Sequence, residues 1–460
     1  MKKLLKNPEN YLFIFYILLF GIVAASIALA QPLKGTDPFF ADPPDEFARF
    51  MVPEFICKYG KIPTGFEEEI RIPGYGFSYG LYNTFPYIVM GYVMRFFSLF
   101  TDSRLFLLYV ARFINVLCGV GMAVTVHAIG KRLFEKKHFK WLFCFAVMFL
   151  PQSLFVHTYV NTDSMCMLAV SLILYGLVCA YQDGINYRNA LWLCLGIILC
   201  ALSYYNAYGY ILSSILLFVA YFYNGTRGKF SYDYKGMLKW GTFIAGIVLV
   251  GISWWFIRSY ILYDGDFLGL ATREKCAMQY AVSGYNPLNM NTYQDKGYSV
   301  TQMIKETYFF DGLFETFVGA YGCLTIRGNI WMYHFYKAFL YAGILGYVVL
   351  IWKNMQKHGF KRIFFHINMI FCMLMPIVLT IYYSYTMDFQ NQGRYIMPMI
   401  VPLMYYSVKG FERIRNAAAK IPEKPVVAAC AVCMAAIAGI LLVFVYGYAF
   451  PIYMETGMTL

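Results

Sequence analysis

Charged residues are scarce in this sequence: Asp, Glu, Lys and Arg together make up 14% of its 460 residues. Hydrophobic residues make up 60%, and the mean hydropathy is +0.53, far above the roughly half-apolar composition of soluble domains. Hydrophobic runs near the ~20 residues that cross a bilayer recur along the chain. The composition therefore predicts an all-α polytopic membrane protein.

The sequence also lacks several motifs. It contains neither a Walker A pattern nor an HExxH sequence, so we expect no nucleotide-driven motor and no zincin site. Its twelve cysteines form no spaced framework, and nine lie in hydrophobic segments, where Cys is a small apolar helix residue. The middles of the hydrophobic segments are almost free of charge, which disfavours an ion-coupled transporter, because such carriers place ionisable groups near the midplane.

The distribution of basic residues predicts the topology. Together with Lys239 at the edge of a span, the short loops assigned to the cytoplasm hold 22 Lys or Arg against 6 Asp or Glu, and the rest of the chain holds 16 against 19. This is the positive-inside pattern, so the net charge of +13 indicates orientation and contact with anionic membrane lipids, and no nucleic acid is expected as a partner. We predict eleven spans, at residues 11–30, 105–130, 141–160, 163–181, 190–204, 208–223, 239–258, 333–352, 363–385, 395–408 and 425–449.

This topology makes residues 1–460 a single transmembrane domain in the plasma membrane, with a cytoplasmic N-terminus. Two large segments, 31–104 and 259–332, then lie on the outer face. Residues 83–100 are apolar enough to span, but a span there would carry the basic segment 131–140 to the outside. We therefore expect a juxtamembrane helix at 83–100 on the outer face, and a plain span with a locally broken charge rule remains the alternative.

Polar groups converge on the predicted outer face. Three carboxylates follow the first span within five residues, in Asp42-Pro43-Pro44-Asp45-Glu46, and acidic groups beside a bilayer are costly unless they are paired or functional. Helix starts and interfacial anchors can explain single members of this set, but not the whole set. The other candidate residues are Asp163 at the start of the fourth span, Arg258 at the end of the seventh, and Gln392, Arg394 and Tyr395 at the start of the tenth.

These residue types suit one kind of chemistry. A carboxylate can accept a proton from a hydroxyl group, and a cluster of three can hold Mg²⁺, Mn²⁺ or Ca²⁺. Arginines at the same interface can bind a phosphate and stabilise it as a leaving group. Gly393 and Arg394 at an outward-facing helix start form one anion site, because exposed backbone N–H groups and a guanidinium act together there. A polyprenyl-phosphate sugar fits this combination of lipid and phosphate.

Several segments resemble motifs of the GT-C superfamily, the polytopic glycosyltransferases that use lipid-phosphate sugar donors. Protein O-mannosyltransferases and the aminoarabinose transferase of lipid A are examples, and the chain is more closely similar to an uncharacterised GT-C-like bacterial membrane family. The resemblance runs from about residue 10 to 410. It rests on Pro43-Pro44-Asp45-Glu46, Asn161-Thr162-Asp163, Trp255-Phe256-Ile257-Arg258 with Tyr263-Asp264-Gly265-Asp266, and Gln392-Gly393-Arg394-Tyr395 with Pro398.

The resemblance implies a role for each residue. Asp45 matches the presumed general base, Glu46 a supporting or cation-binding acid, and Asp163 an acid that contacts donor or acceptor. Arg394 and Arg258 would face the lipid phosphate. Two departures bear on these roles: Arg49 stands where members of the family often have His, and Ser203-Tyr204-Tyr205-Asn206 offers no match for a family lysine.

The expected activity is an inverting transfer of a sugar from a polyprenyl-phosphate donor to a glycan or lipid acceptor of the cell envelope. A donor with one phosphate needs no metal, and the sequence leaves a divalent cation undecided. Two alternatives stay open: a transporter or flippase of lipid-linked sugars, and a non-catalytic protein that binds them.

Overall fold

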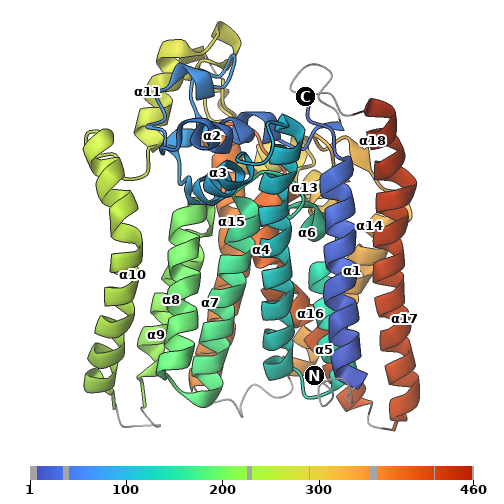
Figure 1. Ribbon diagram of the computed structural model, residues 1–460. Coiled ribbons are helices and arrows are strands. Elements are labelled where there is room, and N and C mark those ends of the chain that lie inside the picture. The colour runs from blue at the N-terminus through green and yellow to red at the C-terminus, as the bar shows by residue number, and fades with distance from the viewer. Residues whose placement is uncertain are drawn as a thin grey trace.

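The computed structural model describes residues 8–34, 41–224, 231–289, 291–352, 360–418 and 420–457. Its helices run side by side as one bundle (Figure 1). Within the described residues, six helices are long and apolar enough to cross a membrane, against the eleven predicted spans. They are α1 (Pro8–Ala30), α4 (Arg104–Leu133), α7 (Asp163–Asp183), α10 (Tyr234–Leu262), α15 (Phe360–Thr386) and the continuous helix of α17 (Glu423–Leu442), a π-helical stretch (Val443–Ala449) and α18 (Phe450–Thr456).

Four further helices run among these six and match predicted spans in position. They are α8 (Tyr187–Ser203), α9 (Tyr208–Tyr221), α14 (Ile330–Trp352) and α16 (Ile400–Ala417). The most extensive contacts in the bundle join α7 to α4 and α8, and α14 to α16. The predominantly helical membrane class predicted from composition is confirmed, whereas the count of eleven spans is not.

The predicted span 141–160 is wrong as a single helix. Helix α5 (Lys137–Met148) ends there, and a separate short helix, α6 (Pro151–Phe155), follows. Leu150 adopts an extended conformation with ψ 126°, because the ring of Pro151 disfavours helical geometry in the residue before it. The predicted span 395–408 also starts differently, as a 3₁₀ stretch at Gly393–Met399 that leads into α16.

One end of the bundle carries most of the segments outside the long helices, including α2, α3 and α11 (Figure 1). Helix α3 has 13 residues, about 20 Å at 1.5 Å per residue, which is shorter than the ~30 Å hydrocarbon core of a bilayer. This length favours the juxtamembrane placement of 83–100. The elements are α2 (Glu46–Tyr59), α3 (Phe85–Phe97), α11 (Leu270–Tyr280), α12 (Val300–Glu306), α13 (Phe309–Val318), the antiparallel pair β1 (Ala320–Tyr321) and β2 (Ile326–Arg327), and 3₁₀ turns at Glu68–Ile70, Tyr79–Leu81, Tyr205–Ala207, Ser283–Tyr285 and Pro287–Asn289.

The two large loop segments pack against each other at this end. Their shared hydrophobic cluster takes Phe77 and Leu81 from the first segment and Tyr263, Cys276 and Ala277 from the second. All twelve cysteines are free, including the three in loops. Hydrophobic contact, rather than a disulfide, therefore joins the two loop segments over the end of the bundle.

Candidate functional site

The Pro-Pro-Asp-Glu segment forms a tight turn that begins α2. The Glu46 N–H donates to the Pro43 carbonyl at 3.2 Å, and Asp45 has φ +60°, in the left-handed region. Non-glycine residues adopt this region rarely, although Asp tolerates it better than most. Such local strain clusters at functional sites, and here it projects the Asp45 carboxylate away from the buried Glu46.

The Asp45 carboxylate lies between two arginines. Its Oδ2 accepts from Arg394 Nη2 at 2.8 Å and lies 3.5 Å from Arg49 Nη2, while 38% of its side chain stays exposed. Burial acts to raise the pKa of Asp45, but Arg394 and then Arg49 outweigh it and hold the pKa at about 2. Asp45 is therefore an ionised, partly accessible carboxylate whose neighbours are both cationic.

Arg394 is almost fully buried, with 4% of its surface exposed. Its Nη2 also donates to the Tyr395 hydroxyl at 3.0 Å, but its Nε and Nη1 have no hydrogen-bond partner. Buried N–H groups are rarely left without acceptors, and those of a cation are the most costly to leave unpaired. The site thus presents unused donors that an anionic ligand can satisfy.

Gly393 fixes where Arg394 lies. A Cβ atom at this position would stand 2.0 Å from the Phe317 backbone nitrogen, so only glycine lets the 3₁₀ stretch approach α13. The Gly393 N–H donates to Thr316 Oγ1 at 2.7 Å and secures this approach. Gln392 also lies here, with its Nε2 bonded to Gln390 and its buried Oε1 without a partner.

Asp163 lies on the opposite side of Arg49 from Asp45. Its Oδ2 is 3.6 Å from Arg49 Nη1, both side chains are 6% exposed, and this oxygen accepts no hydrogen bond. Asp163 does not cap its helix, since Asn161 Oδ1 accepts the Ser164 N–H instead, at 2.9 Å. The structure thus brings together Asp45, Arg49, Asp163 and Arg394 from three separate parts of the chain.

Glu46 faces the interior and has different partners. It accepts from Arg112 Nε at 2.8 Å, from Arg112 Nη2 at 2.6 Å and from the Val160 N–H at 2.7 Å, and both charged side chains are fully buried. Arg112 also donates to the carbonyl oxygens of Ala28, Gln31 and Pro32 at the end of α1. This network joins the start of α2, the end of α1 and the segment before Asp163.

A family described as "Predicted membrane protein (DUF2142)" matches residues 54–403 of the chain. The chain belongs to the DUF2142 family. The matched part contains Asp163, Arg258 and Arg394, while the turn with Asp42, Asp45 and Glu46 precedes it. No curated protein sequence matches this DUF2142 member.

Solved structures share its fold. An oligosaccharyltransferase of the archaeon Archaeoglobus fulgidus, tethered to an acceptor peptide, aligns with a TM-score of 0.55 and 12% identity over 98% of this chain and 56% of its own. The Archaeoglobus fulgidus AglB complex with an inhibitory peptide and a dolichol-phosphate gives 0.54 and 12% over 97% and 56%. A complex of the oligosaccharyltransferase with Zn and sulfate gives 0.53 and 14% over 95% and 53%.

This DUF2142 chain therefore spans little more than half the length of the oligosaccharyltransferases. At 12–14% identity the likeness shows the fold alone. That fold is the GT-C fold, so the resemblance to the GT-C superfamily is confirmed at the level of architecture.

Of the remaining predicted residues, Tyr395 joins this centre, while Arg258 and Asp42 contact other residues. Tyr395 contacts Arg394 directly. Arg258 instead packs over Trp255, donates from Nη2 to the Pro63 carbonyl at 2.5 Å, and keeps a buried Nη1 without a partner. Asp42 accepts the Lys34 N–H at 2.9 Å and is 5% exposed.

These carboxylates do not converge as a metal site. Among the residues that the structure describes, no group of three or more His, Cys, Asp or Glu is placed to hold a metal ion. Glu46 is committed to Arg112 and Val160, and Asp45 to two arginines. In the described residues Asp42, Asp45 and Glu46 therefore form no such group, and the role of a divalent cation stays untested.

Sequence reasoning missed two parts of the site. Arg273, from α11, lies 4.3 Å from the Phe77 ring centroid with a buried Nε that lacks a partner, and nothing in its amphipathic surroundings distinguishes it from a surface arginine. Arg49 belongs to the same missed part, because the sequence marked it only as a departure from the family pattern. The other missed part is a group of tyrosines that interact electrostatically with these charges: Tyr79, Tyr82, Tyr87, Tyr159, Tyr204, Tyr205 and Tyr383.

Proposed function

We propose that this protein is a glycosyltransferase that moves a sugar from a polyprenyl-phosphate donor to a glycan or lipid acceptor of the cell envelope. The observation that carries this proposal is the pair of buried guanidinium groups, Arg394 and Arg49, beside the partly exposed Asp45 carboxylate at one end of a GT-C bundle. The AglB complex with a dolichol-phosphate supports a lipid phosphate as the ligand of such a bundle.

Arg394 is assigned to the donor phosphate. Its unpartnered Nε and Nη1 groups lie on different edges of the guanidinium plane, so each can donate a separate hydrogen bond, and the guanidinium charge favours a phosphate oxygen as the acceptor. Tyr395 and Gln392 adjoin this group and are assigned to the donor head group. Arg258, with one unused buried nitrogen, would contact the same head group from α10.

Asp45 is assigned as the general base. The acceptor hydroxyl oxygen attacks the anomeric carbon, and its proton passes to the Asp45 carboxylate. The bond between that carbon and the phosphate oxygen breaks, and its electron pair leaves on the phosphate, where Arg394 stabilises the charge. A single displacement of this kind inverts the anomeric configuration.

Donor binding would also prepare the base. Before a donor binds, Arg394 and Arg49 hold the Asp45 pKa at about 2, and a carboxylate with so low a pKa is a weak base. A phosphate that takes the Arg394 N–H groups weakens the Arg394–Asp45 ion pair and so raises the Asp45 pKa. Proton acceptance would then follow donor binding.

Asp163 and Glu46 take different parts in this proposal. Asp163 has an oxygen free of hydrogen bonds near Arg49 and is assigned to orient the acceptor hydroxyl. Glu46 is too buried to touch a substrate, and it positions Asp45 through Arg112. The charge bias of the loops supports placing this end of the bundle on the outer face of the plasma membrane.

The test is sugar transfer by the purified full chain in detergent. Radiolabelled polyprenyl-phosphate sugars are supplied with a crude cell-envelope acceptor to wild type, Asp45→Asn and Arg394→Ala. We expect Asp45→Asn to bind donor and transfer little, and Arg394→Ala to lose donor binding as well. Asp102→Asn and Arg104→Ala are matched controls, because both residues are exposed on the same loop segment, away from the site.

The outcomes separate the alternatives. Transfer that disappears in both site variants and persists in both controls supports the enzyme. Donor binding without transfer in wild type, unchanged by Asp45→Asn, would indicate a binding protein or a flippase and overturn the assignment of Asp45.

A further inference from the structure

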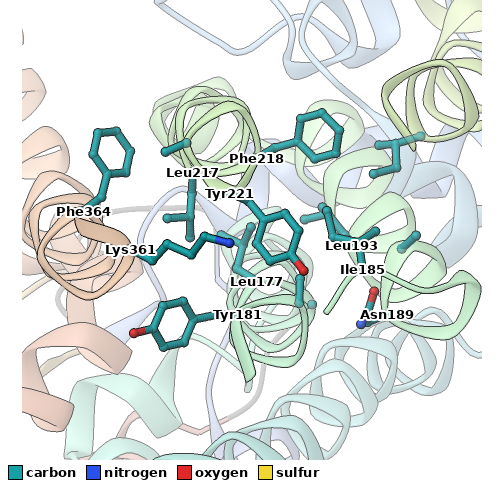
Figure 2. A pocket seen from close by; sticks show the side chains of 15 residues that line it. Leu177, Tyr181, Ile185, Asn189, Leu193, Leu217, Phe218, Tyr221, Lys361 and Phe364 are labelled. Atoms are coloured by element: carbon teal, nitrogen blue, oxygen red, sulfur yellow. The ribbon is translucent and has the colours of Figure 1, made fainter. Parts of the chain in front are cut away.

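A hollow with a lysine beside it lies at the opposite end of the bundle from Asp45. The end of α7, the start of α8, the end of α9 and the start of α15 surround a partly open hollow. Its lining is almost entirely apolar and includes Leu177, Leu193, Leu217 and Phe364. Lys361 reaches over this hollow towards Tyr221 (Figure 2).

Lys361 is a half-buried cation with weak partners. Its Nζ lies 3.2 Å from Asn224 Oδ1 and 4.7 Å from the Tyr221 ring centroid. In the part of the chain that the structure describes, no carboxylate forms an ion pair with it. An ammonium group held by an amide oxygen and an aromatic face retains the capacity to bind an anion.

The surroundings of the hollow select the charge of its occupant. Arg188, Lys235 and Lys239 are exposed around the same helix ends. Of the nearby carboxylates, Asp183 pairs with Arg132 and Asp233 caps the Gly236 N–H. This end of the bundle therefore attracts negative charge, and basic clusters beside membrane-spanning helices bind anionic lipid head groups.

We propose that this hollow is a binding site for an anionic glycerophospholipid. Its acyl chain would lie along the apolar lining formed by α7, α8, α9 and α15, and its phosphate would bind Lys361 Nζ at the level of the helix ends. The medium around membrane-spanning helices is lipid, so an apolar space beside a cation at the interface suits a molecule with both parts. This proposal does not depend on sugar transfer at Asp45.

The test measures lipid retention by the full chain. The protein is purified in detergent and mixed with equal amounts of phosphatidylglycerol and phosphatidylcholine with identical acyl chains, and native mass spectrometry counts the bound lipids. We expect one phosphatidylglycerol retained in preference to phosphatidylcholine. Lys361→Met removes the charge and keeps most of the apolar stem, and should weaken that retention about tenfold or more, as for loss of a charge-assisted hydrogen bond.

Two further variants test whether lipid retention depends on this hollow or on the general positive charge of the surface. Arg362→Ala removes a neighbouring exposed cation from the same helix and should leave retention within about twofold, in line with the small effect of exposed charges. Ala220→Trp keeps Lys361 but fills the hollow from α9, and should abolish retention. Size-exclusion and thermal unfolding profiles must match those of wild type for each variant.

Four results would overturn the proposal. Equal retention of the two lipids would show that the anionic head group is not recognised. Retention of neither lipid would show that the occupant is not a glycerophospholipid. Equal losses in Lys361→Met and Arg362→Ala would show a general surface attraction. Full retention in both Lys361→Met and Ala220→Trp would place the lipid elsewhere.

Discussion

Arg394 Nη2 lies 2.8 Å from Asp45 Oδ2, although the two residues are 349 positions apart in the sequence. Their ion pair joins the turn before α2 to the 3₁₀ stretch before α16. Arg394 Nε and Nη1 have no hydrogen-bond partner, so this contact leaves two guanidinium nitrogens available to donate. The pair is both a tertiary contact and the centre of the proposed donor site.

The first prediction concerns the pH dependence of stability. The Asp45 pKa of about 2 lies below its ordinary value of 3.8 because Arg394 and Arg49 outweigh the effect of burial. A depressed folded-state pKa contributes stability that is present above the ordinary value and is lost as the pH falls towards about 2. Asp45→Asn should therefore unfold at a lower temperature than wild type near neutral pH.

That difference should shrink as the pH is lowered from about 6 to about 3, since the wild type then begins to lose the contribution that the variant already lacks. Thermal unfolding in detergent at several pH values measures it. Asp102→Asn, which replaces an exposed carboxylate, should show no such convergence. A gap between wild type and Asp45→Asn that stays constant over this range would contradict the assigned ion pairs.

The second prediction distinguishes the geometry of Arg394 from its charge. Arg394→Lys keeps the positive charge but loses the planar guanidinium and its fixed set of donor nitrogens. We expect the transfer rate to fall about 10²–10³-fold, the range for removing one donor to a developing anion. Steady-state kinetics with a varied donor concentration measures it, and a Lys variant with near wild-type turnover would show that charge alone suffices.

The third prediction concerns the buried pair of Glu46 and Arg112. Glu46→Gln leaves the Arg112 charge without a partner in a site with no exposure, and breaking such a pair costs about 3–5 kcal/mol. The double replacement Glu46→Met with Arg112→Met should cost less than the two single changes together. Glu54→Gln, which breaks the partly exposed pair with Arg104, is the control and should cost about 1 kcal/mol or less.

These residues also show how far the sequence could lead. The position of Asp45 beside a span and of Arg394 after a glycine were enough to select both. Their pairing depends on packing that brings the turn before α2 to the 3₁₀ stretch before α16. Arg112 was visible as a rare charge in an apolar helix, and a search for its partner could have found Glu46, because an unpaired charge there is costly. Arg273 gave no such signal.

The fold was predictable in class and in most helix positions, because long apolar runs and basic loops are direct consequences of the bilayer. The segment 141–160 was mistaken because its hydropathy continues through Leu150, while the helix does not. Its side chains are buried inside the bundle rather than facing lipid. Hydropathy does not distinguish these two apolar environments.

The fourth prediction is that removing divalent cations leaves transfer unchanged. Glu46 binds Arg112 and the Val160 N–H, and Asp45 lies between two cations. These carboxylates therefore have few free oxygen atoms to coordinate a metal ion. Transfer measured in excess EDTA, with Mg²⁺, Mn²⁺ or Ca²⁺ added back, should match the untreated rate. A loss of transfer that one cation restores would require that these carboxylates rearrange around it.

The fifth prediction tests whether the position of Arg394 depends on Gly393. A Cβ at Gly393 would stand 2.0 Å from the Phe317 nitrogen, so Gly393→Ala must displace the 3₁₀ stretch and move the guanidinium. A displacement of about 1 Å can reduce turnover about 10²-fold. We expect Gly393→Ala to raise the KM for the donor and lower kcat together, because Arg394 acts on both the bound donor and the leaving phosphate.

Gly439→Ala is the matched control. Gly439 lies inside α17, and a Cβ added there would have no neighbouring atom within 4 Å. Alanine at this position should therefore leave activity unchanged and stabilise the helix by about 0.5–1 kcal/mol. The same substitution thus has opposite expected effects at two positions. Full activity in Gly393→Ala would mean that the close approach to α13 does not set the Arg394 position, and that the contacts with Asp45 and Tyr395 hold this arginine in place.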